Sequence, residues 1–124
     1  MQQKYDFIIA GGGLAGLSLA CHMVRSGLRD RSILIIDQAA KKRNDRTWGF
    51  WADRPTLFDS VVYREWGRLH VIGDGLTKDM DLGHYHYKVI RGNDFYDFAH
   101  QSLAAFDNVT FMTGHIDGIE DGRK

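Results

Sequence analysis

Residues Phe7–Ala20 carry the sequence FIIAGGGLAGLSLA, and this stretch decides the fold. The residues from Tyr5 to Ala10 form a short apolar run that ends at a glycine cluster, the pattern of a central parallel strand buried on both faces. After the glycines, apolar residues recur at helical spacing from Leu14 to about Ser26, so a helix is predicted there. The glycines between the two elements predict a tight turn.

A second buried strand is predicted from Ser32 to Asp37, which reads SILIID. Before it, Gly27 is well placed to end the helix in the left-handed conformation that glycine adopts easily. Strand, turn, helix and strand within about 33 residues have the size of a β-α-β unit, whose crossover is almost always right-handed. The sequence therefore predicts an α/β fold with a parallel sheet.

The glycine turn has the spacing of a dinucleotide-binding motif, and it lies directly between a predicted strand and a predicted helix. Gly11 permits the tight turn, Gly13 lets the main chain approach a diphosphate, and Gly16 lets helix and strand pack closely. The diphosphate is expected at the helix amino terminus, which begins with Leu14 and Ala15, because unpaired N–H groups there favour negative charge.

Asp37 ends the second predicted strand 21 residues after Gly16 (37 − 16). This is close to the spacing at which a carboxylate accepts hydrogen bonds from the adenosine ribose of a bound dinucleotide. The alternative is an ordinary glycine-rich turn followed by an ordinary strand-end aspartate. The motif by itself does not separate FAD from NAD.

Later segments predict a small antiparallel excursion from the parallel sheet, followed by a helix and a further strand. Strands are predicted at Arg68 to Ile72 and at His86 to Ile90, on either side of the turn residues Gly73-Asp74-Gly75. Asn93 is expected to cap a helix that ends by Asn108. A strand from Val109 to Thr113 follows.

The last residues predict an incomplete hairpin. Ile116 to Ile119 is expected to be a strand, and Asp121-Gly122 is a strong hairpin-turn signal. A hairpin without its return strand leaves an unpaired edge, so we expect these 124 residues to be a truncated part of a longer protein.

Composition excludes some classes of function. Sixteen basic residues balance sixteen acidic ones, so no overall field favours nucleic acid. The single cysteine, Cys21, excludes an intramolecular disulfide framework, fits a reducing cytoplasm and is expected to be a small apolar helix residue. The uncharged stretch from Phe7 to Val24 raises the alternative of a signal peptide or membrane anchor, but its four glycines disfavour one apolar helix.

Three motifs together resemble a known family: FIIAGGGLAGLSLA, then ILIID, then NDRTWGFW at residues 44–51. They resemble the amino-terminal signature of the lycopene β-cyclases of bacterial carotenoid biosynthesis. The resemblance covers about the first fifty residues well, and the remainder loosely through KVIRGNDFYDF. The glycine motif is shared by a vast superfamily, whereas RTWGFW is much narrower.

The resemblance implies a Rossmann-like FAD-binding domain over residues 1–124 with a parallel sheet core. It implies non-covalent FAD kept reduced by NAD(P)H, and conversion of the acyclic ψ-ends of lycopene, or of a related carotenoid, to β-ionone rings without net redox change. It also implies a cytoplasmic protein in peripheral contact with a membrane. The family's acidic motif, Phe-Leu-Glu-Glu-Thr, does not occur here, so no catalytic acid is assigned and this chain alone is expected to be inactive.

The resemblance carries the cofactor role onto a few residues. Besides the glycine turn and Asp37, Arg46 is expected near the phosphates or ribityl chain. A surface ion pair of Arg46 with Asp45 or Asp53 is the alternative. Arg91, at a strand-to-helix junction, is expected near the flavin, and a solvent-facing position is the alternative. Ile116 is expected to offer its backbone to adenine.

The aromatic residues after Arg46, two histidines and the function of the whole chain each allow more than one interpretation. Trp48, Phe50 and Trp51 either line the flavin or carotenoid channel or form an aromatic core patch. His84 and His86 share one face if both lie in a strand, where a polar sheet surface is favoured over a metal site. For the whole chain, the alternatives to a cyclase are a flavin-dependent monooxygenase or reductase, and a simple binding module.

Overall fold

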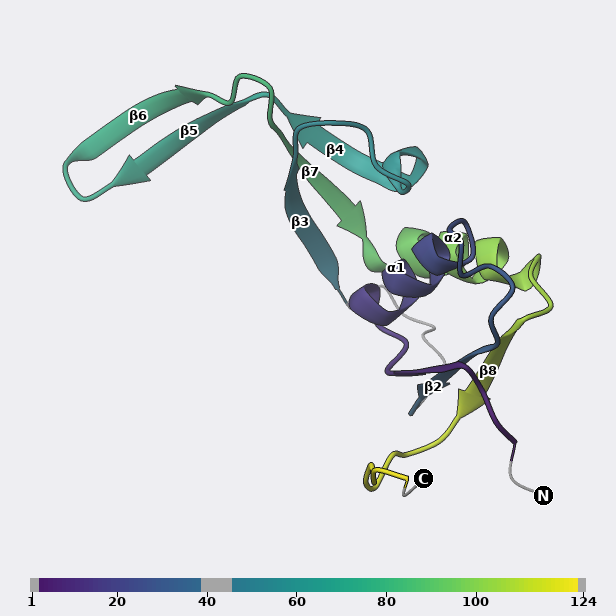
Figure 1. Ribbon diagram of the computed structural model, residues 1–124. Helices are drawn as coiled ribbons and strands as arrows, with labels where there is room; N and C mark the ends of the chain where they lie inside the picture. The colour runs from purple at the N-terminus through teal and green to yellow at the C-terminus, as the bar shows by residue number, and fades with distance from the viewer. Residues whose placement is uncertain (1–2, 39–45, 123–124) are drawn as a thin grey trace. The chain divides into compact units, whose positions relative to one another are not determined.

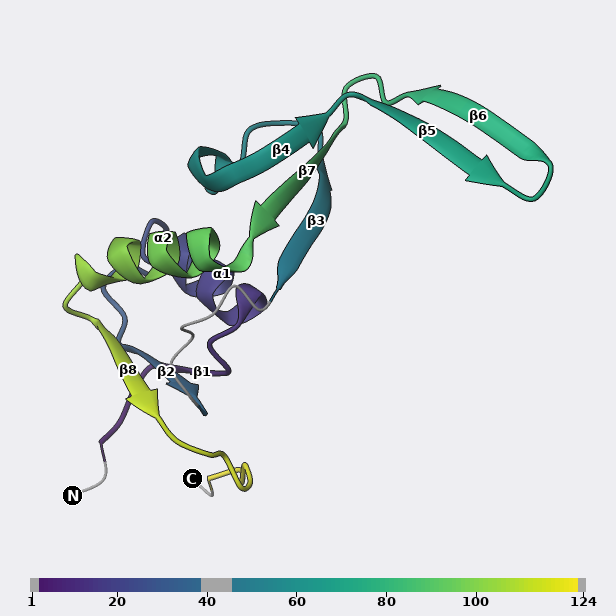
Figure 2. The ribbon, with the colours of Figure 1, turned by 180° about the vertical axis from the view of Figure 1, so that it is seen from behind.

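The computed structural model describes residues 3–38 and 46–122, and the chain divides into two compact units. The first unit contains the described residues of 1–42 and 96–124, and the second those of 43–95. Figures 1 and 2 show the elements of each unit from two sides. The two units are described separately below.

The first unit is built on a parallel sheet with the strand order β1-β2-β8. Strand β1 (Phe7–Ala10) leads through the glycine turn to helix α1 (Leu14–Met23), which is followed by β2 (Ile33–Asp37). Strand β8 (Val109–Thr113) then pairs with β2. The order of strand, turn, helix and strand is confirmed, as are the final strand and the α/β class. The central, buried position predicted for the first strand is wrong, because β1 is at the edge of the described sheet and only Ile9 of its residues is buried.

The core of the first unit lies between this sheet and its helices. Leu17 and Cys21 of α1 are fully buried, as is Ile33 of β2. Helix α2 (Gly92–Ala104) adds Ala99 and Leu103, and Figures 1 and 2 both show α2 beside α1. Cys21 is thus a buried apolar residue, as predicted, and burial raises the pKa of its thiol.

The predicted end of α1 is wrong. The helix ends at Met23, and Gly27 is not among the glycines with positive φ. The hydroxyl of Ser26 donates to the Met23 carbonyl at 2.7 Å and accepts the N–H of Leu28 at 3.1 Å. A serine side chain therefore satisfies the helix end, so no left-handed glycine is required.

The predicted bounds of α2 also need correction. The helix begins at Gly92, so Asn93 lies inside its first turn instead of capping it. It ends at Ala104, before Asn108. The Asn108 amide donates to the carbonyls of Arg29 and Arg31 at 2.8 and 2.7 Å, which fastens the start of β8 to the connection before β2.

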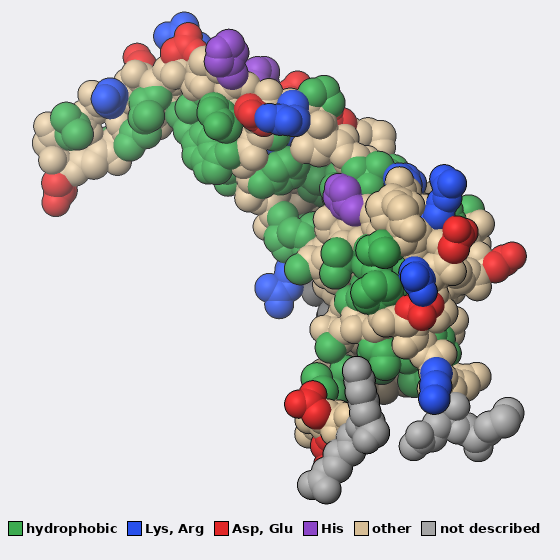
Figure 3. Space-filling view, viewed as in Figure 1, with side chains coloured by type: hydrophobic (Ala, Val, Ile, Leu, Met, Phe, Trp, Pro, Cys, Tyr) green, Lys and Arg blue, Asp and Glu red, His purple; other side chains and the backbone are tan. Residues whose placement is uncertain are grey.

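The second unit is antiparallel throughout its described strands. A three-stranded sheet has the order β3-β7-β4, and a separate hairpin joins β5 to β6. Hydrophobic side chains gather on the surface over these strands (Figure 3). The bounds are β3 Thr47–Ala52, a 3-10 turn Asp59–Val61, β4 Val62–Trp66, β5 Arg68–Gly73, β6 Leu76–Asp81 and β7 His86–Arg91.

The predicted antiparallel excursion is confirmed, but the implied pairing is wrong. Strand β5 pairs with β6 through the turn at Asp74 and Gly75, and Gly75 has a φ of 67°. Strand β7 pairs instead with β3 and β4. Strand β6 reads LTKDMD and is exposed at every position. With so few apolar residues, its sequence does not show the strong alternation that predicts a half-buried strand.

The predicted strand at Ile116 to Ile119 is also wrong. Residues 114–122 belong to no helix or strand. The N–H of Gly114 donates to the Asp37 carbonyl at 2.8 Å, and β2 ends at Asp37. Residues 116–119 therefore lie beyond the end of β2 and do not continue its pairing with β8.

Candidate functional site

The glycine turn is shaped by two features of its backbone. Gly11 has a φ of 113°, which side-chain-bearing residues rarely adopt, and its N–H donates to the Ile36 carbonyl at 2.8 Å. Helix α1 then begins at Leu14, with Gly13 as an N-cap that supplies no side-chain hydrogen bond. The turn thus passes directly from β1 into α1.

Close packing requires a glycine at position 16. A Cβ at Gly16 would lie 2.1 Å from the Gly11 carbonyl oxygen and 3.0 Å from a methyl group of Ile9. By contrast, a Cβ at Gly11 or Gly13 would meet nothing within 4 Å. Gly16 therefore lets the helix approach the turn, while open space remains over Gly11 and Gly13.

The start of α1 can hold an anion. The first intrahelical bond runs from the Leu17 N–H to the Gly13 carbonyl at 3.0 Å. The N–H groups of Leu14, Ala15 and Gly16 precede it and have no acceptor within the helix. With no acidic side chain in the first turn, the helix dipole and these N–H groups favour a negative group such as a phosphate.

The structure brings Asp37 to this turn. Its carboxylate oxygen Oδ2 would lie 3.0 Å from a Cβ at Gly12, so the carboxylate sits against the glycine backbone. Its other oxygen accepts the Gln38 N–H at 3.0 Å. The strand-end carboxylate and the glycine turn are thus neighbours, as the sequence predicts.

A pocket of about 240 Å³ opens beside them. It lies where β1, β2 and β8 end, and ligands of open α/β sheets bind outside the carboxyl ends of the strands. Three of the predicted residues, Gly11, Asp37 and Ile116, meet in it, although Ile116 is not in a strand. The full lining is Ala10, Gly11, Ile36, Asp37, Gln38, Gly114 and Ile116.

These residues fit an adenine dinucleotide. The space over Gly11 and Gly13 and the helix start suit a diphosphate, and Asp37 beside them suits a ribose diol. Phosphate binding here needs no side-chain cation, because the donors are backbone N–H groups.

The two predicted arginines belong to the second unit. The Arg46 carbonyl accepts the Gly92 N–H at 2.7 Å. The Arg91 guanidinium binds Asp94 at 3.1 Å and lies 4.1 Å from the centre of the Tyr63 ring. Their roles near the cofactor stay predictions.

The alternative for Arg46 was a surface ion pair with Asp45 or Asp53. Asp53 forms a two-bond ion pair with Arg54, at 3.0 and 3.1 Å, which lowers the pKa of the Asp53 carboxyl. Asp45 lies outside the described residues.

The three aromatic residues of RTWGFW are divided between the two faces of β3. Trp48 packs edge-on against Phe95, with ring centres 5.4 Å apart, which fits the core-patch interpretation. Phe50 shares this face, because alternate residues of a strand point the same way. Trp51 points to the other face, where its side chain is exposed.

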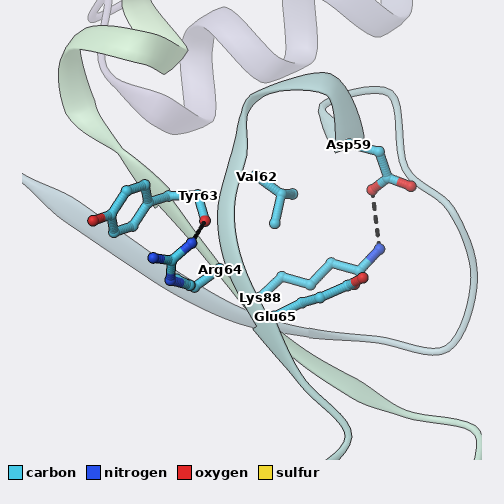
Figure 4. Close-up of a pocket in the computed structure, with 6 residues that line it drawn as sticks. All are labelled: Asp59, Val62, Tyr63, Arg64, Glu65 and Lys88. Atoms are coloured by element: carbon cyan, nitrogen blue, oxygen red, sulfur yellow. Dashed lines mark hydrogen bonds and ion pairs between the residues drawn. The ribbon is translucent and has the colours of Figure 1, made fainter.

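A second cavity, of about 310 Å³, lies in the second unit, and no motif of the sequence predicts it. Lys88 extends toward Asp59 at its edge, and their charged atoms are 3.0 Å apart (Figure 4). Only 9% of the Lys88 side chain is exposed. The lining is Asp59, Val62, Tyr63, Arg64, Glu65 and Lys88.

The Lys88–Asp59 pair anchors the loop before β4 to β7. Partial burial acts to raise the pKa of the Asp59 carboxyl, but hydrogen bonds from Lys88 and Thr56 outweigh it, and the pKa lies below its usual value. Lys88 lies two residues before buried Ile90 in β7, so both side chains point to the same face of the sheet. A lysine at such an inward-facing position is the sequence feature that could have indicated a buried ion pair.

The premise of the histidine metal site is wrong. Strand β7 begins at His86, so His84 lies in the preceding turn and does not share a strand face with it. His86 Nδ1 lies 3.6 Å from a carboxylate oxygen of Glu65. Within residues 3–38 and 46–122, no three His, Cys, Asp or Glu side chains gather as metal ligands would.

Comparison with solved structures defines the class of fold. The chain is similar to PqsL, described as "a probable FAD-dependent monooxygenase" from Pseudomonas aeruginosa, with a TM-score of 0.69 and 14% identity over 88% of this chain and 32% of that one. It is also similar to the flavin-dependent brominase Bmp2, with a TM-score of 0.59 and 17% identity over 94% of this chain and 31% of that one. At such identities, the likeness shows a shared α/β fold.

Sequence comparison identifies the family. The model of the family described as lycopene cyclase protein matches residues 6–124, so this chain belongs to the lycopene cyclase family. A curated relative, named "Putative FAD-containing monooxygenase MymA", of Mycobacterium tuberculosis, is 29% identical over 83 residues. That match covers 62% of this chain and 16% of the relative. The chain therefore spans only a small part of MymA and about a third of the solved structures.

We predict that Gly16→Ala lowers the stability of the protein by several kcal/mol, because the new Cβ would overlap the Gly11 carbonyl oxygen. Gly27→Ala is the matched control, since a Cβ there meets nothing within 4 Å. Thermal unfolding measures both. Equal melting temperatures for the two variants would contradict the proposed close packing.

Proposed function

We propose that this chain is the FAD-binding portion of an enzyme that cyclises the ψ-ends of lycopene, or of a related acyclic carotenoid, to β-ionone rings. The observation that carries the proposal is the match to the lycopene cyclase family over residues 6–124. The glycine turn, the free helix start and Asp37 support the cofactor part of the proposal, because they fit an adenine dinucleotide.

Each residue of the pocket has a proposed part in holding FAD. The N–H groups of Leu14, Ala15 and Gly16 would bind the diphosphate, for which the turn leaves open space at Gly11 and Gly13. Asp37 would accept hydrogen bonds from the ribose, and the backbone of Ile116 would face adenine. We propose Arg46 and Arg91 as further contacts to the phosphate and flavin parts.

The cofactor's proposed contribution is electrostatic. Bound FAD, kept reduced by NAD(P)H, would supply negative charge that stabilises a cation developing on the substrate in a site from which water is excluded. The residues of this chain would hold and orient it.

The proposed reaction balances without net oxidation. A proton adds to the terminal double bond of a ψ-end, and a neighbouring double bond supplies the electron pair that closes the ring. Loss of a proton from an adjacent carbon then restores a double bond, so the product is an isomer of the substrate. No residue of this chain is assigned as the acid.

The second candidate function is a flavin-dependent monooxygenase or reductase. The similarity to MymA and PqsL, named as a putative and a probable FAD monooxygenase, favours it. The family match favours the cyclase, because it covers nearly the whole chain.

Pigment analysis tests the choice between the two functions. The full-length reading frame, expressed in bacteria that accumulate lycopene, is expected to yield carotenoids with β-ionone rings and the same mass as lycopene. Oxygenated products would favour the monooxygenase. Unchanged lycopene in the presence of abundant folded, FAD-containing protein would count against the cyclase.

We predict that Asp37→Ala weakens the affinity for FAD by about 1 to 3 kcal/mol, because charge-assisted hydrogen bonds to the ribose are lost. Asp30→Ala is the control, since Asp30 is an exposed carboxylate of the same unit. Titration of the apoprotein with FAD, followed by flavin fluorescence, measures both constants. Unchanged affinity of Asp37→Ala would remove the ribose role.

We also propose that the whole protein is cytoplasmic and touches a membrane peripherally. Within the described part of the chain, no helix is long and apolar enough to cross a membrane. The register of the β5–β6 hairpin places Leu69, Val71, Leu76 and Met80 on one face, and the last three are at least 38% exposed. An apolar carotenoid would reach its enzyme from a lipid phase.

Co-sedimentation of the full-length protein with phosphatidylglycerol and phosphatidylethanolamine vesicles tests the membrane contact. We predict that Leu76→Asp reduces the sedimented fraction severalfold, because burying a carboxylate in the lipid boundary is unfavourable. Thr77→Asp is the control, since Thr77 lies on the opposite face of the hairpin. Equal sedimentation of the two variants would exclude this face as the contact.

A further inference from the structure

A side-chain hydrogen bond joins the two segments of chain that border the pocket of the first unit. Gln38 follows β2 directly, and its amide atom Nε2 lies 3.0 Å from Nδ1 of His115, which comes two residues after β8. The two residues are 77 positions apart in the sequence, but β2 and β8 run parallel and end side by side (Figure 1). We call the hydrogen bond between Gln38 and His115 the latch.

Each end of the latch adjoins residues that line the pocket. Gln38 is part of the lining and follows Asp37, the proposed ribose ligand. His115 is not part of the lining, but it lies between Gly114 and Ile116, which are. A role of His115 in binding would therefore act through its neighbours and not through contact with the ligand.

The position of the backbone after β8 depends on the latch. The backbone bond from the Gly114 N–H to the Asp37 carbonyl, at 2.8 Å, is the last one between the two segments. Residues 115–122 belong to no helix or strand, and within the described residues the latch is the hydrogen bond that ties them to another segment. Without it, the Ile116 backbone would no longer be held beside the pocket.

The latch also borders the Asp37 carboxylate. One oxygen of this carboxylate accepts the Gln38 N–H at 3.0 Å. The other oxygen lies against the turn, where a Cβ at Gly12 would be 3.0 Å away from it. Because the N–H group belongs to a residue of the latch, a change in the direction of the chain at Gln38 would turn the carboxylate.

The latch does not depend on a charged histidine. A glutamine amide can donate from its nitrogen to an unprotonated Nδ1, or turn over and accept with its oxygen from a protonated one. On the other side of the ring, Nε2 of His115 lies 3.5 Å from a carboxylate oxygen of Asp117, whose side chain is 95% exposed. An ion pair so exposed contributes little, so the latch is the contact that fixes His115.

We propose that Gln38 and His115 are positioning residues for the adenosine half of the cofactor. This inference rests on the proposed function and adds the residues that shape its cofactor site. The latch holds the Ile116 backbone and the Asp37 carboxylate where adenine and ribose would bind, which reduces the ordering that a ligand must impose. The ligands concerned are esters of adenosine diphosphate and ADP itself.

The test measures the affinity of the full-length apoprotein for FAD and for ADP. Gln38→Met keeps the length of the side chain and removes the amide, and it is expected to weaken both affinities about threefold to tenfold, the loss that corresponds to one hydrogen bond. His115→Leu is expected to show the same loss. His115→Asn, whose amide can still pair with Gln38, is expected to bind like the parent. Gln101→Met, which changes an exposed glutamine of α2, is the matched control.

A double variant separates positioning from a general structural role. If the two residues act through one bond, Gln38→Met combined with His115→Leu is expected to bind FAD no more weakly than either single variant. The melting temperature of the ligand-free protein is expected to stay close to that of the parent, because the latch is exposed. Additive losses, or losses of affinity that follow the melting temperature, would overturn the inference.

The outcomes also separate this inference from the proposed function. If the parent binds FAD and ADP, and the folded latch variants bind them equally well, the inference is overturned and the proposed cofactor site stands. If the parent binds neither ligand, both are overturned. Equal losses for FAD and ADP that are restored in His115→Asn support both.

Discussion

The close approach of helix α1 to the glycine turn is the constraint on which the first unit depends. Gly16 packs against the Gly11 carbonyl at a distance that leaves no room for a Cβ. The N–H of Gly11 is held at the same time by the Ile36 carbonyl of β2. One short backbone segment therefore joins β1, α1 and β2, and it leaves the amino terminus of α1 beside the carboxyl ends of the strands.

The candidate site follows from that junction. Parallel strands end at the same edge, so Ala10, Asp37 and Gly114 come together although they are far apart in the chain. The helix start offers N–H groups, and Asp37 offers a carboxylate. N–H donors and a carboxylate acceptor are thus side by side in the folded chain, which is the arrangement that the proposed binding of a diphosphate and a ribose requires.

The second unit illustrates how one sheet can carry two surfaces. Alternation along β3 and β7 sends Trp48 and Lys88 to a packed face and Trp51 and Tyr87 to an open one. On the packed face, Asp59 neutralises the buried Lys88 ammonium, without which its burial would be strongly unfavourable. On the open face, Gly49 makes room for the Tyr87 ring.

The sequence by itself determined the β-α-β unit and placed Gly11 and Asp37 at the pocket beside it, because glycine spacing, apolar runs and a strand-end carboxylate act over short distances. It did not predict β3, β4 or β6, the partners of β7, or the end of α1. Only the tertiary structure decided these: Lys88 meets Asp59 across 29 positions, and the rings of Trp51, Tyr87 and Trp66 come together only when β3, β7 and β4 pair in one register. Cross-strand register depends on the summed packing of distant residues, so no local pattern specifies it.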